Sequence, residues 1–133
     1  MAGDSMADGS AFLSGKRCLV IDDEFLIALD IQQTLESAGA RVTCIGDADE
    51  ALAALKGGAQ FDVAVLDLKL SGFARDSTNV AALLTERGVP FVFLTGLRAG
   101  NELVQNFPHA PLVEKPYQVA LLMDALRRAL DMN

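Results

Sequence analysis

Four short apolar runs of this chain each lead into a side chain that can take part in phosphoryl transfer. Asp22 and Asp23 end the first run, Asp67 ends the second, Thr95 ends the third, and Lys115 follows the fourth. If the runs are parallel strands, these five side chains meet at the carboxyl edge of one sheet. Three acids, a hydroxyl and an ammonium gathered there predict a phosphoryl-transfer site that binds a divalent cation.

Asp67 is the candidate nucleophile, because a carboxylate can attack phosphorus and form an acyl phosphate. The transferred group is strongly negative, so a Mg²⁺ ion is expected to bridge it to the carboxylate. Asp23 and Asp67 suit direct ligation of Mg²⁺, and Asp22 suits a contact through water. Each acid alone also reads as a helix cap or turn former. Three acids at one edge would repel one another, which favours the metal site.

Two further groups are candidates for contacts with the phosphoryl oxygens. Lys115 carries a compact charge that can pair with Asp67 or with the phosphoryl group, although most lysines lie exposed on the surface. A cis peptide bond before Pro116 would turn the Lys115 loop toward the site. Thr95 offers a hydroxyl to a phosphoryl oxygen, or else makes a local hydrogen bond at the strand end.

The elements that must position these residues alternate along the whole chain. Short apolar or β-branched runs predict strands, and apolar residues three or four apart, such as Phe25, Leu26, Leu29 and Leu35, predict helices. Strands are expected at 16–22, 41–45, 62–66, 91–94 and 112–114, and helices at 24–38, 47–56, 78–87, 101–107 and 117–130.

Five strand-helix units predict an α/β fold, the flavodoxin-like doubly wound (βα)5 three-layer sandwich. The first, third and fourth strands are continuously apolar, as central strands covered on both faces should be. The second is more mixed, which is typical of an edge. The expected parallel order is 2-1-3-4-5. Its switch point, where ligands bind in such sheets, lies between strands one and three, beside Asp22, Asp23 and Asp67.

Composition limits the class of protein and its partners. The 133 residues are 51% hydrophobic, enough for one globular domain, expected at 15–133 behind a flexible leader at 1–14. The net charge of −7 argues against direct contact with nucleic acid or an anionic membrane surface. Cys18 and Cys44, both in expected strands, are predicted to be buried reduced thiols of a cytoplasmic protein. His109 is expected to be a solvated surface residue.

The chain resembles the receiver domains of two-component response regulators over roughly 15–133. The segment 19–24, Leu-Val-Ile-Asp-Asp-Glu, resembles the acidic pair of that family, and 65–67, Val-Leu-Asp, its phosphoacceptor. Thr95-Gly96 resembles its switch hydroxyl, and 114–116, Glu-Lys-Pro, its lysine.

The resemblance implies a phosphoprotein of the phosphorelay type. A sensor histidine kinase or a histidine phosphotransfer protein would pass a phosphoryl group to Asp67, and the domain would catalyse only its own phosphorylation and dephosphorylation. It implies a homodimer or downstream protein contact through the fourth helix, fifth strand and fifth helix. The implied Mg²⁺ ligands are Asp22, Asp23, Asp67 and the main-chain carbonyl of Lys69.

The chain also departs from the family pattern. Leu112 stands where an aromatic residue is common, so switching is not expected to use an aromatic rotamer. The proline-containing turn after the phosphoacceptor is missing from 69–73. The segment 93–97, Phe-Leu-Thr-Gly-Leu, resembles the subfamily named for a Phe-Ala-Thr-Gly-hydrophobic-Tyr motif, with Leu94 replacing its alanine and Arg98 its tyrosine.

Two other functions use related chemistry or the same sheet. A haloacid-dehalogenase-type phosphatase also uses a strand-end aspartate and Mg²⁺, but it needs a second acid at the position of Lys69. A flavodoxin-like flavin carrier needs a hydroxyl- and glycine-rich phosphate loop, where this chain has Asp22, Asp23 and Glu24. No output domain is expected within these residues; whether they are a complete regulator or one domain of a larger protein is left open.

Overall fold

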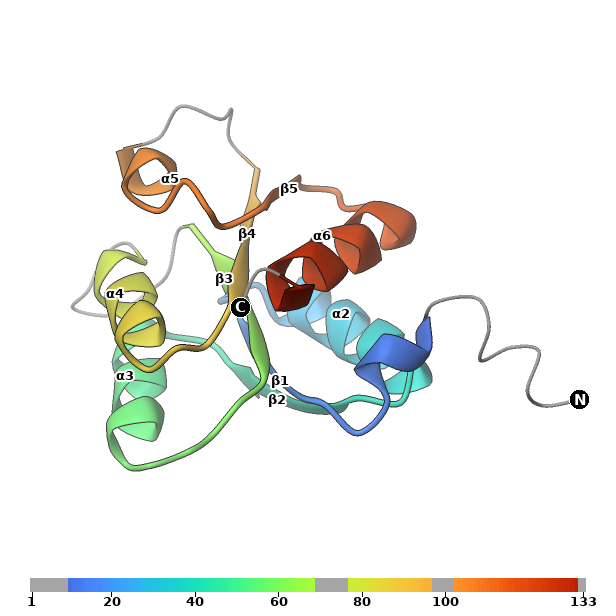
Figure 1. The fold of residues 1–133 in the computed structure, drawn as a ribbon, viewed down its shortest axis with the longest axis horizontal. Helices are drawn as coiled ribbons and strands as arrows, with labels where there is room; N and C mark the ends of the chain where they lie inside the picture. Colours follow the sequence, from blue (N-terminus) through green and yellow to red (C-terminus); the bar gives the residue numbers. More distant parts are fainter. Residues whose placement is uncertain (1–9, 69–76, 97–101, 132–133) are drawn as a thin grey trace, which may run out of the picture.

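The structure is a computed structural model that describes residues 10–68, 77–96 and 102–131. These residues form one parallel sheet between two layers of helices (Figure 1). The strands are β1 (Arg17–Ile21), β2 (Arg41–Ile45), β3 (Val63–Asp67), β4 (Phe91–Thr95) and β5 (Leu112–Glu114). The helices are the 3-10 helix η1 (Ser10–Leu13) and α2 (Phe25–Ser37), α3 (Ala48–Lys56), α4 (Thr78–Glu86), α5 (Glu102–Asn106) and α6 (Val119–Asp131).

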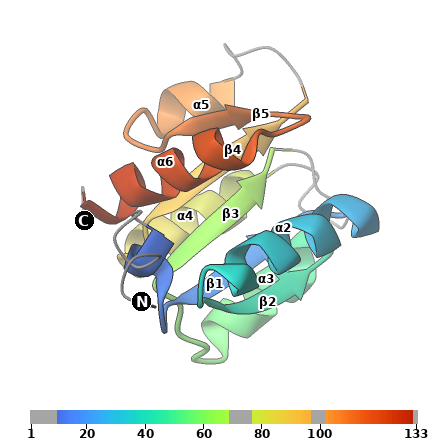
Figure 2. The same ribbon diagram turned by 90° about the vertical axis from the view of Figure 1, so that its right-hand side faces the viewer.

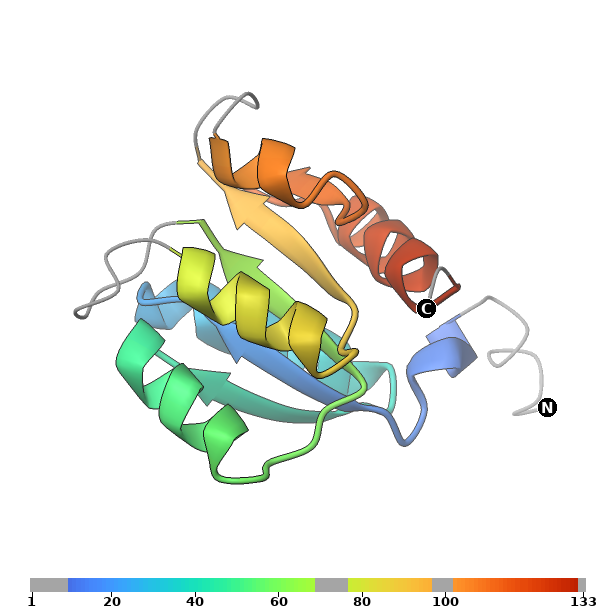
Figure 3. The same ribbon diagram turned by 60° about the vertical axis from the view of Figure 1, so that its left-hand side comes forward.

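The strands lie in the order β2-β1-β3-β4-β5, and all neighbouring pairs are parallel, so the predicted order is confirmed. Ile21 pairs with Leu66, and Asp67 pairs with Leu94, so β1, β3 and β4 end at one edge. Figure 2 shows α2 and α6 on one face of the sheet, and Figure 3 shows α3, α4 and α5 on the other. This is the expected flavodoxin-like three-layer sandwich.

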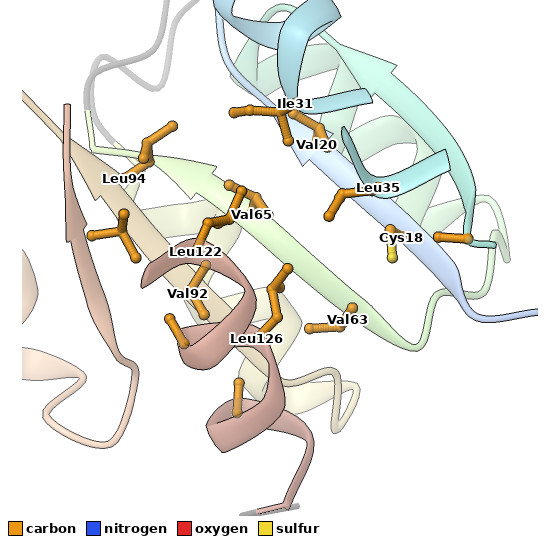
Figure 4. Packing of buried hydrophobic residues seen from close by; sticks show 14 of the residues in the cluster. Cys18, Val20, Ile31, Leu35, Val63, Val65, Val92, Leu94, Leu122 and Leu126 are labelled. Carbon is orange, nitrogen blue, oxygen red and sulfur yellow. The ribbon is translucent and has the colours of Figure 1, made fainter. Parts of the chain in front are cut away.

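The central strands supply two hydrophobic clusters, because successive side chains of a strand point to opposite faces. Cys18 and Val20 of β1 face α2 and α6, whereas Leu19 and Ile21 face α3 and α4. In the cluster that contains Cys18 and Val20, four fully buried helix residues pack against the sheet (Figure 4): Ile31, Leu35, Leu122 and Leu126. Burying a side chain of this size contributes about 2 kcal/mol, before the entropy lost on ordering it is subtracted.

Local sequence explains where α3 begins and where α2 ends. The Asp47 carboxylate accepts a hydrogen bond of 2.7 Å from the main-chain N–H of Glu50, which caps the start of α3. Gly39 follows α2 with φ of +94°, a conformation that costs glycine little. A Cβ at this position would lie 3.1 Å from the Cα of Ser14, so the close approach of the two segments also requires glycine.

The residues of α2 that are buried are mostly not the apolar residues whose spacing predicted the helix. Phe25 and Leu26 are 74% and 76% exposed, and Leu29 is 36% exposed. The residues of α2 that are buried against the sheet are Ala28, Ile31 and Leu35. Helical spacing identifies a helix, but it does not determine which of two apolar stripes faces the sheet. The first turn of α2 therefore presents large apolar side chains to solvent beside the edge where β1 ends.

The expected leader at 1–14 extends too far into the domain. Leu13 is fully buried in the cluster under α2 and α6. Its carbonyl accepts a hydrogen bond from the N–H of Lys16, and the Arg127 guanidinium lies 4.9 Å from the centre of the Phe12 ring. The sequence before Gly15 looked polar and loop-like, but Phe12 and Leu13 supply enough apolar surface to hold η1 against the fold. Residues 1–9 lie outside the described part of the chain.

The two cysteines have different surroundings. Cys18 is buried, and that burial, followed by the charge of Asp62, raises the pKa of its thiol to about 11. Cys44 was expected to be buried but is exposed, because it lies on the edge strand β2, where only Ile45 is buried. His109 is exposed, as expected. Among the described residues, no helix combines the length and apolar character needed to cross a bilayer.

Candidate functional site

A cavity of about 610 Å³ opens at the carboxyl edge of the sheet. Residues that follow β1, end β3 and β4, and follow β5 contribute to its wall, because parallel strands bring their carboxyl ends together. The wall includes Asp23, Glu24, Asp67, Thr95 and Lys115. Four of these five had been predicted to share one site, and Glu24 is the addition.

The Lys115 ammonium contacts three carboxylates at this edge of the sheet. Its Nζ lies 3.3 Å from Asp22 Oδ2, 3.3 Å from Asp67 Oδ2 and 2.5 Å from Glu24 Oε1. Only 14% of the Lys115 side chain is exposed. Burial lowers the pKa of Lys115, but the hydrogen bond that Lys115 donates to Glu24 and the charges of Asp67 and Asp22 outweigh it, so that the pKa is raised. The ammonium is therefore held in its charged form. The Lys115–Pro116 peptide bond is cis.

Asp22 is buried, and its two carboxylate oxygens have different partners. Oδ1 accepts a hydrogen bond of 2.9 Å from the N–H of Glu24, which orders the start of α2. Oδ2 makes no hydrogen bond within the described residues, although Lys115 Nζ lies 3.3 Å away. The charge of Lys115 is close to this buried oxygen, but its lone pairs still lack a hydrogen bond. A carboxylate oxygen in this condition can accept a cation.

The donor set fits a hard divalent cation. Oxygen atoms of Asp22, Glu24 and Asp67 lie within 4.8 Å of one another. Carboxylate oxygens are the ligands that Mg²⁺ and Ca²⁺ prefer. Asp23 lines the same cavity, and the Lys69 carbonyl lies outside the described residues. Glu24 was not predicted to have a role in the site; its only signal in the sequence is that it directly follows Asp23.

Thr95 and Ser77 are buried polar residues close to Asp67, at the end of β4 and the start of α4. Thr95 ends β4, lines the cavity, and is 1% exposed. Ser77, just before α4, is fully buried and donates its hydroxyl hydrogen bond to the main-chain carbonyl of Asp67. This bond ties the start of α4 to the end of β3. Ser77 was not predicted from the sequence, because a serine just before a helix usually caps that helix with its side chain. Here the Ser77 side chain makes no capping hydrogen bond to α4.

The loop that carries Lys115 is also fastened to α2. The Tyr117 hydroxyl donates a hydrogen bond of 2.5 Å to Asp30 Oδ2 and lies 3.4 Å from Thr34 Oγ1. Burial and then the Asp30 hydrogen bond raise the pKa of Tyr117, so the phenol stays protonated and remains a donor. Two contacts, Lys115 with Glu24 and Tyr117 with Asp30, therefore join this loop to the start and middle of α2.

Together these groups can bind a cation and an anion side by side. The carboxylates attract the cation, while the Lys115 ammonium and Thr95 hydroxyl can meet the oxygens of a bound anion. Asp67 belongs to the carboxylate cluster and also contacts Lys115, so an anion held by Lys115 would lie close to the Asp67 carboxylate. A carboxylate, an ammonium and a hydroxyl beside a cation are groups that phosphoryl-transfer sites use.

Comparison with solved structures identifies similar proteins. A response regulator receiver protein from Sinorhizobium medicae is 30% identical, with a TM-score of 0.80, and the match covers 90% of this chain and 97% of that one. A CheY-like receiver domain protein from Methanospirillum hungatei is 26% identical, with a TM-score of 0.78 and coverage of 90% and 96%. The response regulator PhyR from Brucella abortus is 29% identical, with a TM-score of 0.74, and the match covers 96% of this chain and 53% of that one. No protein-family model and no curated protein matches the chain.

Proposed function

This chain belongs to the response-regulator receiver family, and from that premise we propose that it is the phosphoacceptor domain of a two-component phosphorelay. The observation that carries the proposal is the convergence of Asp22, Glu24 and Asp67 on Lys115 at the carboxyl edge of the sheet, where Lys115 and Thr95 line the same cavity. A carboxylate nucleophile, a cation site and two donors for phosphoryl oxygens are the parts that this reaction needs.

In the proposed reaction, an Asp67 carboxylate oxygen attacks the phosphorus of a phosphohistidine. The new O–P bond forms an acyl phosphate on Asp67 as the P–N bond breaks, and the imidazole leaves with the electron pair of that bond. Lys115 and Thr95 bind the phosphoryl oxygens as charge moves onto them. Bound Mg²⁺ supplies charge neutralisation between the carboxylates and the phosphoryl group. Hydrolysis of the acyl phosphate by water would reset the domain, with no other substrate turned over.

The proposed metal ligands are Asp22, Asp23, Asp67 and the Lys69 carbonyl. Support for a cation comes from the orphaned Asp22 Oδ2 and from the short separations of the carboxylate oxygens of Asp22, Glu24 and Asp67. The assignment to Mg²⁺ follows from the phosphoryl chemistry.

The proposed phosphodonor is a sensor histidine kinase or a histidine phosphotransfer protein. Such a donor would approach through the open mouth of the cavity, next to the exposed side chains of Phe25 and Leu26. The surface formed by α5, β5 and α6 is the proposed contact for a second copy or a downstream protein. We assign the receiver domain to 10–133, since η1 packs with it, and propose a cytoplasmic protein of the Phe-Ala-Thr-Gly-hydrophobic-Tyr subfamily.

Labelling with a small phosphodonor tests the proposal. The protein is incubated with acetyl phosphate and Mg²⁺, and the modified residue is mapped by mass spectrometry. We expect one phosphoryl group on Asp67, which is lost on base treatment and absent without Mg²⁺. Asp67→Asn should not be labelled, while Asp124→Asn, the same change at an exposed position of α6, should be labelled as the wild type. Persistent labelling of Asp67→Asn would refute the assignment.

A further inference from the structure

Glu24 has the shortest contact of the three carboxylates that surround Lys115. Its Oε1 lies 2.5 Å from Lys115 Nζ, against 3.3 Å for both Asp22 and Asp67. Glu24 is the N-cap residue of α2, but within the described chain its side chain makes no capping hydrogen bond. The Asp22 carboxylate instead holds the Glu24 main-chain N–H. The Glu24 backbone is therefore fixed while its carboxylate is directed to Lys115.

The three carboxylates also differ in their freedom to move. The side chains of Asp22 and Asp67 are 1% and 6% exposed, whereas that of Glu24 is 56% exposed. Glu24 can therefore move into solvent at small cost, while Asp22 and Asp67 stay beside the cavity. Lys115 has one mobile counterion and two fixed ones. The mobile counterion is the one that an incoming anion can displace.

We propose that Glu24 is the resting counterion of Lys115 and that it lowers the affinity of the site for a phosphoryl group. An arriving phosphoryl group must displace Glu24 from its contact with the Lys115 ammonium. Its oxygens are also repelled by the negative charge of Glu24. The same charge attracts the cation that binds Asp22 and Asp67. Glu24 thus acts on the anion through Lys115, as a positioning residue, and it shortens the time that the phosphorylated state persists. This inference rests on the function proposed above.

The test measures the two ligands separately on Glu24→Gln, which keeps the shape of the side chain and removes its charge. Beryllofluoride, an inorganic mimic of the phosphoryl group, is titrated at saturating Mg²⁺ by calorimetry. We expect it to bind about fivefold more tightly to Glu24→Gln, the factor that corresponds to a partly exposed ion pair of about 1 kcal/mol. Mg²⁺ titrated alone should bind more weakly to the variant. A purely structural role for Glu24 would not shift the two affinities in opposite directions.

Three variants besides Glu24→Gln separate the possible outcomes. Glu86→Gln removes the same charge from an exposed position at the end of α4 and should bind both ligands as the wild type does. Glu24→Asp keeps the charge but places it farther from Lys115, because the side chain is shorter. The affinity of Glu24→Asp for beryllofluoride should therefore lie between those of the wild type and Glu24→Gln. Unchanged or weaker beryllofluoride binding by Glu24→Gln overturns the inference, provided that wild type binds and Asp67→Asn does not. If the wild type itself fails to bind beryllofluoride with Mg²⁺, the proposed function fails instead.

Discussion

Removing the charge of Lys115 should destabilise the protein in the absence of divalent cations. Lys115→Met keeps an unbranched apolar stem of similar length, so that its packing is largely preserved. The ammonium lies within 3.3 Å of both Asp22 and Asp67, two carboxylates that are almost fully buried. Without Lys115 these two charges face each other and Glu24 with no cation between them.

The size of the effect follows from the exposure of each partner. Breaking a buried ion pair typically costs about 3–5 kcal/mol, because a charge is left uncompensated in the interior. The cavity here is open to water, and the Glu24 side chain is 56% exposed, so part of that cost is recovered by solvation. We expect the free energy of unfolding to fall by about 2 kcal/mol. For a domain of this size that lowers the melting temperature by roughly 8 °C.

The pH dependence has a defined sign. The pKa of Lys115 is raised in the folded protein, so its contribution to stability is complete below the unfolded lysine value of about 10.4 and is lost as pH rises through the folded value. The difference in stability between wild type and Lys115→Met should therefore be constant from pH 7 to 9. It should shrink above about pH 10.4, where the lysine of the unfolded chain begins to lose its proton, and vanish above the folded pKa.

Urea unfolding in EDTA, followed by circular dichroism, measures the difference at each pH. Lys56→Met removes a charge from an exposed lysine at the end of α3 and should stay within about 0.5 kcal/mol of wild type. Mg²⁺ should restore more stability to Lys115→Met than it adds to the wild type, because the cation takes the place of the ammonium. Equal stability of wild type and Lys115→Met in EDTA at pH 7.5 would refute the reasoning.

Other consequences of the site can be measured directly. Mg²⁺ at ten times its dissociation constant should stabilise the wild type by about 1.4 kcal/mol, and Asp23→Ala should abolish the accompanying rise in melting temperature; a surviving rise would place the metal elsewhere. Tyr117→Phe removes the hydroxyl that binds Asp30 and should loosen the Lys115 loop, weakening beryllofluoride binding severalfold, while Thr34→Val should have little effect. Beryllofluoride should change hydrogen exchange along α5, β5 and the start of α6, and changes confined to α2 and α3 would contradict the proposed contact surface.

The strands and their order were predictable from the sequence for a physical reason. A strand buried on both faces must be continuously apolar, and β1, β3 and β4 have that pattern in an otherwise amphipathic chain. The burial of α2 was not predictable, because Ala28 and Ile31 compete with larger apolar residues such as Phe25 and Leu26 for the buried face. Docking on the sheet buried Ala28, Ile31 and Leu35 and left Phe25 and Leu26 exposed, a choice that the apolar spacing alone does not specify.

The sequence by itself determined which chemical groups stand at the ends of the strands. Asp22, Asp67, Thr95 and Lys115 each follow or end an apolar run, and chain order with right-handed crossovers brings such positions to one edge. Only the tertiary structure decided which groups touch. Glu24 and Lys115 are 91 residues apart, and Asp30 and Tyr117 are 87 apart. No local pattern encodes contacts at those separations, because they depend on how α2 and the loop after β5 come to rest on the same side of the sheet.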